Sequence, residues 1–390
     1  MTPLTVETLS LAQYRSYDLC TIETGGASVA LYGPNGAGKT NILEALSMLV
    51  PGRGIRRAGI AEVGRKPGEM GWRVKARIAG PDGQAEVVTG TSAEGTGRRT
   101  VEIDGKAASQ TALGRVMRMV WLTPAMDRLW TGPAADRRRF LDRMTLGFEP
   151  DHAETSLAYE KAMRGRNRLL REPGWDPNSH RAWLDGLEGQ MARSGARIAR
   201  ARARALDLLS SAQDGAETAF PRAELAILGQ AEARFAQALA SGGDLDQTEA
   251  EEAADLAQRL AAGRPRDAAA GRSLDGAHRS DLEAAYAPKA MPASACSTGE
   301  QKALLISLCL ANTRALAQTT GAAPVLLLDE VAAHLDKDRR LALYGEIEAL
   351  GAQSWMTGTS DGLFEGLPGN ALRLGVSEAD GLSRIEGSTA

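Results

Sequence analysis

The segment that most constrains the fold is the glycine-rich stretch from Gly33 to Thr40, which reads GPNGAGKT. It matches the phosphate-binding loop pattern, in which glycines leave backbone N–H groups free to surround phosphates. Lys39 is placed to reach the β- and γ-phosphates of a nucleotide, and the Thr40 hydroxyl is placed to ligate Mg²⁺. An apolar run, Ala27 to Tyr32, precedes the loop, and apolar residues follow it at helical spacing over Asn41 to Val50. The sequence therefore predicts a buried strand, the loop, and a helix whose N-terminus faces phosphates.

A second apolar run, Val325 to Leu328, is followed directly by two carboxylates, Asp329 and Glu330. A strand with this ending can supply the acidic groups that the phosphate loop lacks. We expect Asp329 to share a Mg²⁺ ion with Thr40, directly or through water. We expect Glu330 to orient or deprotonate the attacking water, so that Glu330 and Lys39 are the candidate catalytic residues.

The distance along the chain between the loop and the acidic strand narrows the class of protein. Residues 41–324, 284 in all, separate the two, whereas small-molecule kinases and GTPases close this gap much sooner. A long insertion followed by an S-x-G-E segment and then by a strand ending in Asp-Glu is the layout of an ABC-type ATPase head. In that layout Ser297, Thr298 and Gly299 lie at a helix N-terminus and contact the γ-phosphate held by a second subunit. The sequence therefore predicts ATP sandwiched in a two-fold dimer.

Changes in the sequence pattern divide the chain into three segments. Residues 1–150 and 273–390 carry strand and turn signals, including three short strands between residues 72 and 103 that predict an antiparallel meander. Residues 151–272 carry long helical patterns, with one candidate strand, Leu225 to Leu228, and a loop expected over Gly263 to Arg272. We therefore expect an α/β fold. Both ends of the chain form an ABC-type P-loop ATPase head with a mixed central sheet and the meander, and the middle forms an inserted all-α arm domain.

Composition and charge exclude several classes of protein. The net charge is −3, so a nucleic-acid partner would have to be met by a local basic surface. No apolar run reaches the roughly 18 residues of a membrane span, and the first residues lack the layout of a signal peptide, so we expect a cytoplasmic protein. The three cysteines, Cys20, Cys296 and Cys309, share no short spacing, which argues against a disulfide framework or a zinc site.

Two groups of arginines stand out in the sequence. Four arginines, here called the arginine stripe, fall on one face of a predicted helix: Arg193, Arg197, Arg200 and Arg204. The stripe can follow a DNA phosphate backbone, or it can pair with acidic residues across a helix pair, and both interpretations stay open. For the consecutive arginines Arg137 to Arg139 we favour a solvated charged face, because exposed charge is the usual case.

Six segments together resemble the RecF family of bacterial recombination mediators, which is related to the SMC-type DNA-repair ATPases. The resemblance runs over almost the whole chain, and the block at residues 124–142 is the most discriminating because ABC transporters lack it. The segments are Leu11 to Tyr17 with Arg15, Gly33 to Asn41, Pro124 to Asp142 with its G-P-x-x-x-R-R-x-F-L-D core, G-x-H-R-x-D-L at Gly276 to Leu282, S-T-G-E-Q-K at Ser297 to Lys302, and D-E-V-A-A-H-L-D at Asp329 to Asp336.

The resemblance implies an ATP-dependent dimer that binds DNA at gaps and at junctions between single and double strands. It also implies action with RecO and RecR to help load RecA on single strands, and support of replication restart and SOS induction. By position, Ser297 with Gly299 would form the signature that acts in trans, and Asp336 the dimer-interface loop. The nucleotide-binding set implied around the loop is Gly33, Pro34, Asn35, Gly36, Ala37, Gly38, Lys39, Thr40 and Asn41.

The chain departs from the family pattern at three places. Ala125 stands where the family usually has an acidic residue, and Glu330 stands where many relatives have a second aspartate. The last central strand offers no histidine where ABC transporters place their γ-phosphate sensor. Thr357 or Thr359 would have to replace it, so we expect slow ATP hydrolysis.

Three other functions compete with a DNA-binding ATPase. A P-loop phosphotransferase would have no use for the Ser297 segment, and a transporter-type ATPase subunit would not carry the block at residues 124–142. A structural SMC-like protein would need a long coiled coil, which an arm of about 120 residues cannot make.

Overall fold

The computed structural model describes residues 3–66, 70–91, 97–172, 176 and 180–386. The chain forms two compact units, of which unit 1 comprises residues 1–127, 215–222 and 298–390 and unit 2 comprises residues 128–214 and 223–297. The first change from one unit to the other lies at residues 127/128 and the last at 297/298, whereas the sequence led us to expect segment limits at 150/151 and 272/273. The difference arises because the first α-helix after residue 128, α4 (Ala134–Phe148), packs against α5, α6 and β10, all of which belong to unit 2.

An antiparallel sheet forms one layer of unit 1. Its six strands lie in the order β2-β1-β4-β5-β6-β7, which confirms the expected meander after the first helix. A two-residue turn at Asp104 and Gly105 joins β6 to β7, and both residues have positive φ, as such a hairpin turn requires. The strands are β1 (Thr5–Tyr14), β2 (Tyr17–Glu23), β4 (Arg73–Gly80), β5 (Gly83–Gly90), β6 (Thr100–Ile103) and β7 (Lys106–Ala107).

A second sheet of six strands forms the other β-layer of unit 1, in the order β15-β14-β3-β13-β12-β8. Strands β14, β3, β13, β12 and β8 run parallel, and β15 pairs antiparallel with β14 at the edge. The carboxyl ends of β3, β13 and β12 therefore meet at one edge of the sheet. The strands are β3 (Val29–Tyr32), β8 (Met119–Leu122), β12 (Val325–Leu328), β13 (Ser354–Gly358), β14 (Leu372–Ala379) and β15 (Leu382–Ile385).

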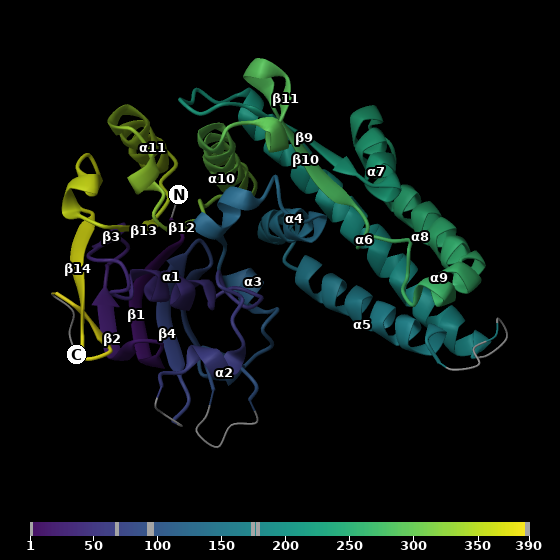
Figure 1. Ribbon diagram of the computed structural model, residues 1–390, viewed down its shortest axis with the longest axis horizontal. Helices are drawn as coiled ribbons and strands as arrows, with labels where there is room; N and C mark the ends of the chain where they lie inside the picture. Colours follow the sequence, from purple (N-terminus) through teal and green to yellow (C-terminus); the bar gives the residue numbers. More distant parts are fainter. Residues whose placement is uncertain (1–2, 67–69, 92–96, 173–175, 177–179, 387–390) are drawn as a thin grey trace. The chain divides into compact units, whose positions relative to one another are not determined.

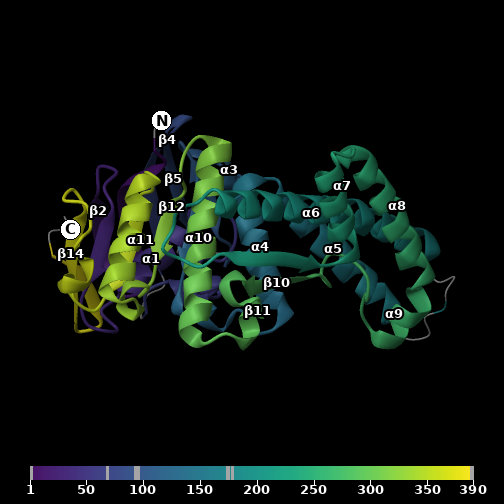
Figure 2. The same ribbon diagram turned by 90° about the horizontal axis from the view of Figure 1, so that it is seen from above.

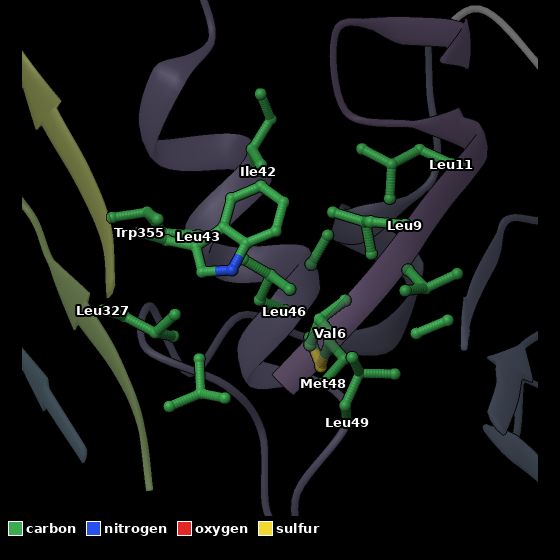
Figure 3. Close-up of a cluster of buried hydrophobic side chains, with 14 of the residues drawn as sticks. Val6, Leu9, Leu11, Ile42, Leu43, Leu46, Met48, Leu49, Leu327 and Trp355 are labelled. Carbon is green, nitrogen blue, oxygen red and sulfur yellow. The ribbon is translucent and has the colours of Figure 1, made fainter. Parts of the chain in front are cut away.

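Helix α1 (Lys39–Ser47) lies between the two sheets and carries the core of unit 1 (Figure 3). Its Leu43 and Leu46 are fully buried with Leu9 of β1 on one side and Trp355 of β13 on the other. Burying one such leucine contributes roughly 1.5–3 kcal/mol, so the helix that follows the phosphate loop is fixed by packing on both sides.

Two helices, α10 (Thr298–Thr320) and α11 (Lys337–Ala349), cover the face of the second sheet that lies opposite α1 (Figure 1). Side chains of β12 alternate between the two faces, as the period of a strand requires. Leu327 joins the core around α1, whereas Leu326 and Leu328 line a small apolar space with Ile306 of α10 and Leu343 of α11. The continuous apolar run that predicted a buried strand is explained by this burial on both faces.

The remaining short elements of unit 1 are α2 (Ile60–Val63), α3 (Leu113–Val116), and the 3₁₀ turns η4 (Ala332–His334) and η5 (Asp361–Phe364), while η1 (Pro124–Arg128) spans the changeover between the units. Within the described part of the chain, no helix combines the length and the apolar character that crossing a membrane requires.

Unit 2 is built on the long helix α6 (Arg181–Asp214), which packs against α5 and α8 (Figure 1 and Figure 2). Strand β9 (Ala223–Leu228) confirms the candidate strand at Leu225 to Leu228 and corrects the expectation of an all-α arm; it pairs with β10 in a three-stranded sheet of order β11-β10-β9. Pairing with β10, which comes from beyond residue 272, stabilises this short strand. The other elements are α5 (His152–Leu170), α7 (Gln230–Ser241), α8 (Leu245–Ala262), α9 (Arg264–Ala270), β10 (Asp281–Tyr286), β11 (Met291–Pro292), η2 (Ala287–Lys289) and η3 (Ala293–Ala295).

The expected loop over Gly263 to Arg272 is wrong, because residues 264–270 form helix α9. Its proline lies in the first turn, where no N–H is needed, and Gly271 ends it in the left-handed conformation. Asp267 of α9 is fully buried and accepts a hydrogen bond from Arg166 of α5 at 2.7 Å. This ion pair to a residue 101 positions away stabilises a helix whose local sequence is typical of a loop.

Two of the family-like segments meet inside unit 2. Arg137 of α4 donates to both carboxylate oxygens of Asp281 at 2.8 and 2.7 Å, and Arg138 donates to the carbonyl oxygen of Ser280 at 2.8 Å. Arg139 pairs with Asp136. The expected solvated face is therefore wrong for Arg137 and Arg138, which join α4 to β10.

Candidate functional site

The phosphate loop has the backbone conformation that its glycines predicted. Gly33, Gly36 and Gly38 have φ values of 150°, 87° and 105°. A Cβ atom on Gly33 would overlap the carbonyl oxygen of Val376 in β14, and one on Gly38 would overlap the hydroxyl of Ser383 in β15. The terminal hairpin thus packs directly on the loop, and two of the glycines are required by this close approach as well as by their backbone angles.

Lys39, the first residue of α1, is almost fully buried. Its ammonium group donates to the carbonyl oxygens of Gly33 and Pro34 at 2.7 and 2.8 Å. An ammonium carries three protons, so these two bonds leave one proton for a phosphate oxygen. Burial lowers the pKa of Lys39, and the nearby carboxylates of Glu330 and Asp329 oppose that shift.

The structure brings the loop and the acidic strand together, as the sequence predicted. The Thr40 hydroxyl donates to Oδ1 of Asp329 at 2.9 Å, although 289 positions separate the two residues. Asp329 is 6% exposed, and its backbone N–H donates to the carbonyl oxygen of Leu122 in β8 at 2.9 Å. Strand order explains the meeting, because β3 and β12 flank β13 and end at the same edge.

A third strand contributes to the same cluster. Thr357 of β13 is fully buried, and its hydroxyl donates to Oδ1 of Asp329 at 2.8 Å. The same hydroxyl accepts a hydrogen bond from the backbone N–H of Glu330 at 2.9 Å. Glu330 has φ of 54°, in the left-handed region that non-glycine residues rarely adopt. The chain therefore turns sharply directly after Asp329.

Sequence reasoning assigned no role to Lys302, which the structure places near the acidic pair. Its ammonium lies 3.8 Å from a carboxylate oxygen of Asp127. Burial lowers the pKa of Lys302, and the charges of Asp127 and Glu330 oppose that shift. Lys302 is the last residue of the family-like segment S-T-G-E-Q-K, and this position could have marked it in the sequence as a candidate functional residue.

A polar network supports the helix behind the phosphate loop. Arg15 donates to both carboxylate oxygens of Glu44 in α1 at 2.8 and 2.7 Å, and Glu44 is fully buried. This hydrogen bonding raises the pKa of Arg15. Asn41, expected to bind nucleotide, donates to the Ser16 hydroxyl at 2.8 Å. The segment with Arg15 therefore contacts α1, which sequence reasoning did not specify.

The residues expected to act in trans lie at the N-terminal ends of α10 and α11. Gly299 lies in the first turn of α10, with open space around the position of an added Cβ. Asp336 is exposed and caps α11 by accepting a hydrogen bond from the backbone N–H of Arg339 at 2.8 Å. Ser297 directly precedes α10. Their contact with a nucleotide needs a second copy of the chain, so it stays a prediction.

Three arginines of the arginine stripe have acidic partners in unit 2. Arg197 pairs with Glu249 of α8 at 3.2 Å, and Arg200 pairs with Asp246 and Glu249 at 2.6 and 2.9 Å. Arg204 pairs with Glu149 at 2.7 Å. These ion pairs are those expected if the stripe pairs with acidic residues of neighbouring helices. Contact between the stripe and DNA stays a prediction.

Comparisons with known proteins agree over the length of the chain. The family model described as RecF/RecN/SMC N-terminal domain matches residues 5–373. The DNA replication and repair protein RecF of Mesorhizobium japonicum is 48% identical over 375 residues, which cover 95% of this chain and 96% of that protein. Its counterpart in Caulobacter vibrioides is 46% identical over 388 residues, which cover 97% of each chain.

Solved structures show the same fold. The recombination mediator protein RecF with ATP, from the RecFOR pathway, is similar with a TM-score of 0.79 at 22% identity, covering 99% of this chain and 100% of that one. An Smc head domain from Pyrococcus furiosus is similar with a TM-score of 0.55 at 16% identity, covering 99% of this chain and 96% of that one. These similarities confirm the expected ABC-type ATPase head.

Proposed function

The chain belongs to the RecF family, and on this premise we propose that it is an ATP-dependent DNA-binding protein of recombinational repair and replication restart. It dimerises around ATP, binds gapped duplex at junctions between single and double strands, and acts with RecO- and RecR-type mediators to help load RecA. Its relatives are named as DNA replication and repair proteins, and the similar solved structure is named as a recombination mediator in the RecFOR pathway, which supports this assignment.

The observation that carries the proposal is the hydrogen bond between Thr40 and Asp329 at 2.9 Å. It joins a phosphate loop to an acidic strand end across 289 positions of the chain. This arrangement is the one a nucleoside triphosphate and its divalent cation need. A phosphate loop or an acidic strand end is common by itself, and the contact between the two in one cluster favours a nucleotide-controlled switch.

The donor set around Asp329 suits Mg²⁺. The hydroxyl of Thr40 and the carboxylate of Asp329 are hard oxygen ligands of the kind that this ion prefers. Mg²⁺, when bound, neutralises charge on the phosphate oxygens. We propose that Thr40 and Asp329 hold it.

The other residues of the cluster have separate roles in ATP hydrolysis. Lys39 donates its third hydrogen bond to a phosphate oxygen and, as a cation, stabilises the negative charge there. Glu330 accepts a proton from the attacking water or orders that water. Backbone N–H groups at the start of α1 point toward phosphates, where the helix dipole adds to the attraction.

The two-fold dimer completes the site. Ser297, Gly299 and Asp336, at the N-terminal ends of α10 and α11, reach the γ-phosphate from the second subunit. Hydrolysis is slow, because a histidine sensor is missing from the strand that carries Thr357. ATP therefore closes the dimer for long enough to act as a clamp on DNA.

Analytical ultracentrifugation of a Glu330→Gln variant tests this proposal, because that variant keeps the site's shape and loses the base. With ATP and Mg²⁺ it should sediment as a dimer and bind gapped DNA more tightly than without nucleotide. Lys39→Arg is the matched control, since it keeps the positive charge, and it should lose both effects of ATP. A monomer under all conditions would refute the sandwich model, and unchanged DNA affinity with ATP would refute nucleotide control.

The alternatives predict different results in the same experiment. A phosphotransferase would show turnover that depends on a second small substrate and would not dimerise on ATP. A transporter-type ATPase subunit would dimerise on ATP without any effect of gapped DNA.

A further inference from the structure

The Thr357 hydroxyl makes two hydrogen bonds, and together they define what this side chain can do. Oγ1 donates to Asp329 at 2.8 Å and accepts from the N–H of Glu330 at 2.9 Å. A hydroxyl has a single proton, and this one is already used on Asp329. Thr357 is therefore suited to hold the acidic pair, and poorly suited to sense a γ-phosphate in place of the missing histidine.

The two acidic residues differ in how far they depend on Thr357. Asp329 is also held by the Thr40 hydroxyl and by its own N–H bond to Leu122. Glu330 has the unfavourable φ of 54°, and its N–H is held by Thr357. A residue in this conformation persists only when its surroundings hold it there. Loss of the hydroxyl would leave Asp329 tethered and would release the turn at Glu330.

We infer that Thr357 is a positioning residue that sets the orientation of Glu330 toward the attacking water, without touching the nucleotide. This inference rests on the proposed ATPase function. Strand order supports it, because β13 lies between β3 and β12 and places Thr357 between the phosphate loop and the acidic pair. A general base contributes about 10²–10⁴-fold to a rate and only when it is correctly placed.

The test compares steady-state ATP hydrolysis by the full-length wild type, Thr357→Val and Thr357→Ser. Valine replaces the hydroxyl with a methyl group of similar shape, whereas serine keeps the hydroxyl. Thr357→Val should lower kcat by roughly 10- to 100-fold, because the base is misplaced, and should leave KM for ATP within about twofold. Thr357→Ser should recover most of the lost kcat.

A double-mutant cycle with Glu330→Gln separates positioning from a general structural role. In the Glu330→Gln background, Thr357→Val should lower kcat no further, because the group that it positions is already removed. The matched control is Thr145→Val, since Thr145 is a fully buried threonine of α4 whose hydroxyl donates to the carbonyl oxygen of Leu141 in the same helix. Thr145→Val should keep wild-type kcat. If Thr357→Val does not fold, Thr357→Ala is measured against the same expectations.

The outcomes are distinct. A wild type that hydrolyses no ATP overturns the proposed ATPase and this inference with it. Wild-type hydrolysis with an unchanged kcat in Thr357→Val overturns the inference alone. A further fall in kcat on adding Thr357→Val to Glu330→Gln also overturns it, since Thr357 would then act through another group.

Discussion

Removing one buried arginine should destabilise the helical unit far more than removing an exposed neighbour. Arg166 of α5 is fully buried and donates four hydrogen bonds. Its partners are Glu188 at 2.9 Å, Asp267 at 2.7 Å, the Ser273 hydroxyl at 2.8 Å and the Leu260 carbonyl oxygen at 2.7 Å. These partners come from α6, α9, the segment before β10, and α8, so a single guanidinium joins four parts of unit 2.

The size of the effect follows from what Arg166→Met would leave behind. Asp267 is fully buried, and its other ion-pair contact is to Arg266 at 3.5 Å. Removing one partner of a buried ion pair costs about 3–5 kcal/mol, because the remaining charge is buried without compensation. At 3 kcal/mol the ratio of unfolded to folded protein rises more than about 100-fold.

Arg164→Met on the same helix is the matched control. Arg164 pairs with Glu160 one turn away, and the two side chains are 67% and 55% exposed. An exposed pair at this spacing contributes only about 0.3–0.5 kcal/mol. The two variants carry the same substitution two residues apart, so their difference isolates burial of the ion pair.

Urea unfolding followed by circular dichroism at 222 nm provides the measurement, since α5, α6 and α8, three of the four longest helices described, lie in unit 2. The transition of these helices should move to markedly lower urea in Arg166→Met and should hardly move in Arg164→Met. A difference below about 1 kcal/mol between the two variants would refute the reasoning, because it would place the Arg166 network in the range of a surface pair.

Three further predictions concern the loop, a buried histidine and the arginine stripe. Gly36→Ala should destabilise the protein by about 1–2 kcal/mol, the cost of its backbone angle alone. Gly33→Ala should cost more, because the Cβ added at Gly33 would also overlap the carbonyl oxygen of Val376, whereas a Cβ at Gly36 meets open space. Equal losses of stability in thermal unfolding of the two variants would contradict this prediction. Burial lowers the pKa of His278, so the folded state binds fewer protons than the unfolded state, and stability should fall as pH drops below about 6.5. His278→Gln should flatten that dependence, and an unchanged slope of unfolding free energy between pH 8 and pH 5.5 would argue against it. Arg197→Glu in the stripe should lower the salt dependence of DNA binding if the stripe contacts phosphates, and an unchanged salt slope would assign the stripe to ion pairing alone.

Much of the candidate site could be predicted because its signals are local. The strand before the phosphate loop, the glycines within it and the helix after it are neighbours in the sequence, and the structure confirms each. The limits of the acidic strand, Val325–Leu328, were predicted to the residue. Apolar runs and glycine patterns report burial and backbone freedom, and both act over a few residues.

Two features of unit 2 were predicted incompletely or wrongly, because the contacts that stabilise them come from far along the chain. The strand at Leu225 to Leu228 was expected without its partner β10, and α9 was expected to be a loop because the contact of Asp267 with Arg166 is not visible in the local sequence. The arginines Arg137 and Arg138 looked solvated for the same reason, since Asp281 and Ser280 are distant in the sequence.

The sequence was sufficient to predict the phosphate loop, the acidic strand and the pairing of Thr40 with Asp329, because these follow from backbone freedom, spacing and residue type. The folded chain was needed to show that a third strand supplies a side chain to the acidic pair. Because β13 lies between β3, which precedes the loop, and β12, which precedes the acidic pair, the Thr357 hydroxyl forms hydrogen bonds with the Asp329 carboxylate and the Glu330 N–H. Hydrogen bonds of this kind are set by which strands lie side by side, and that order is a property of the folded chain.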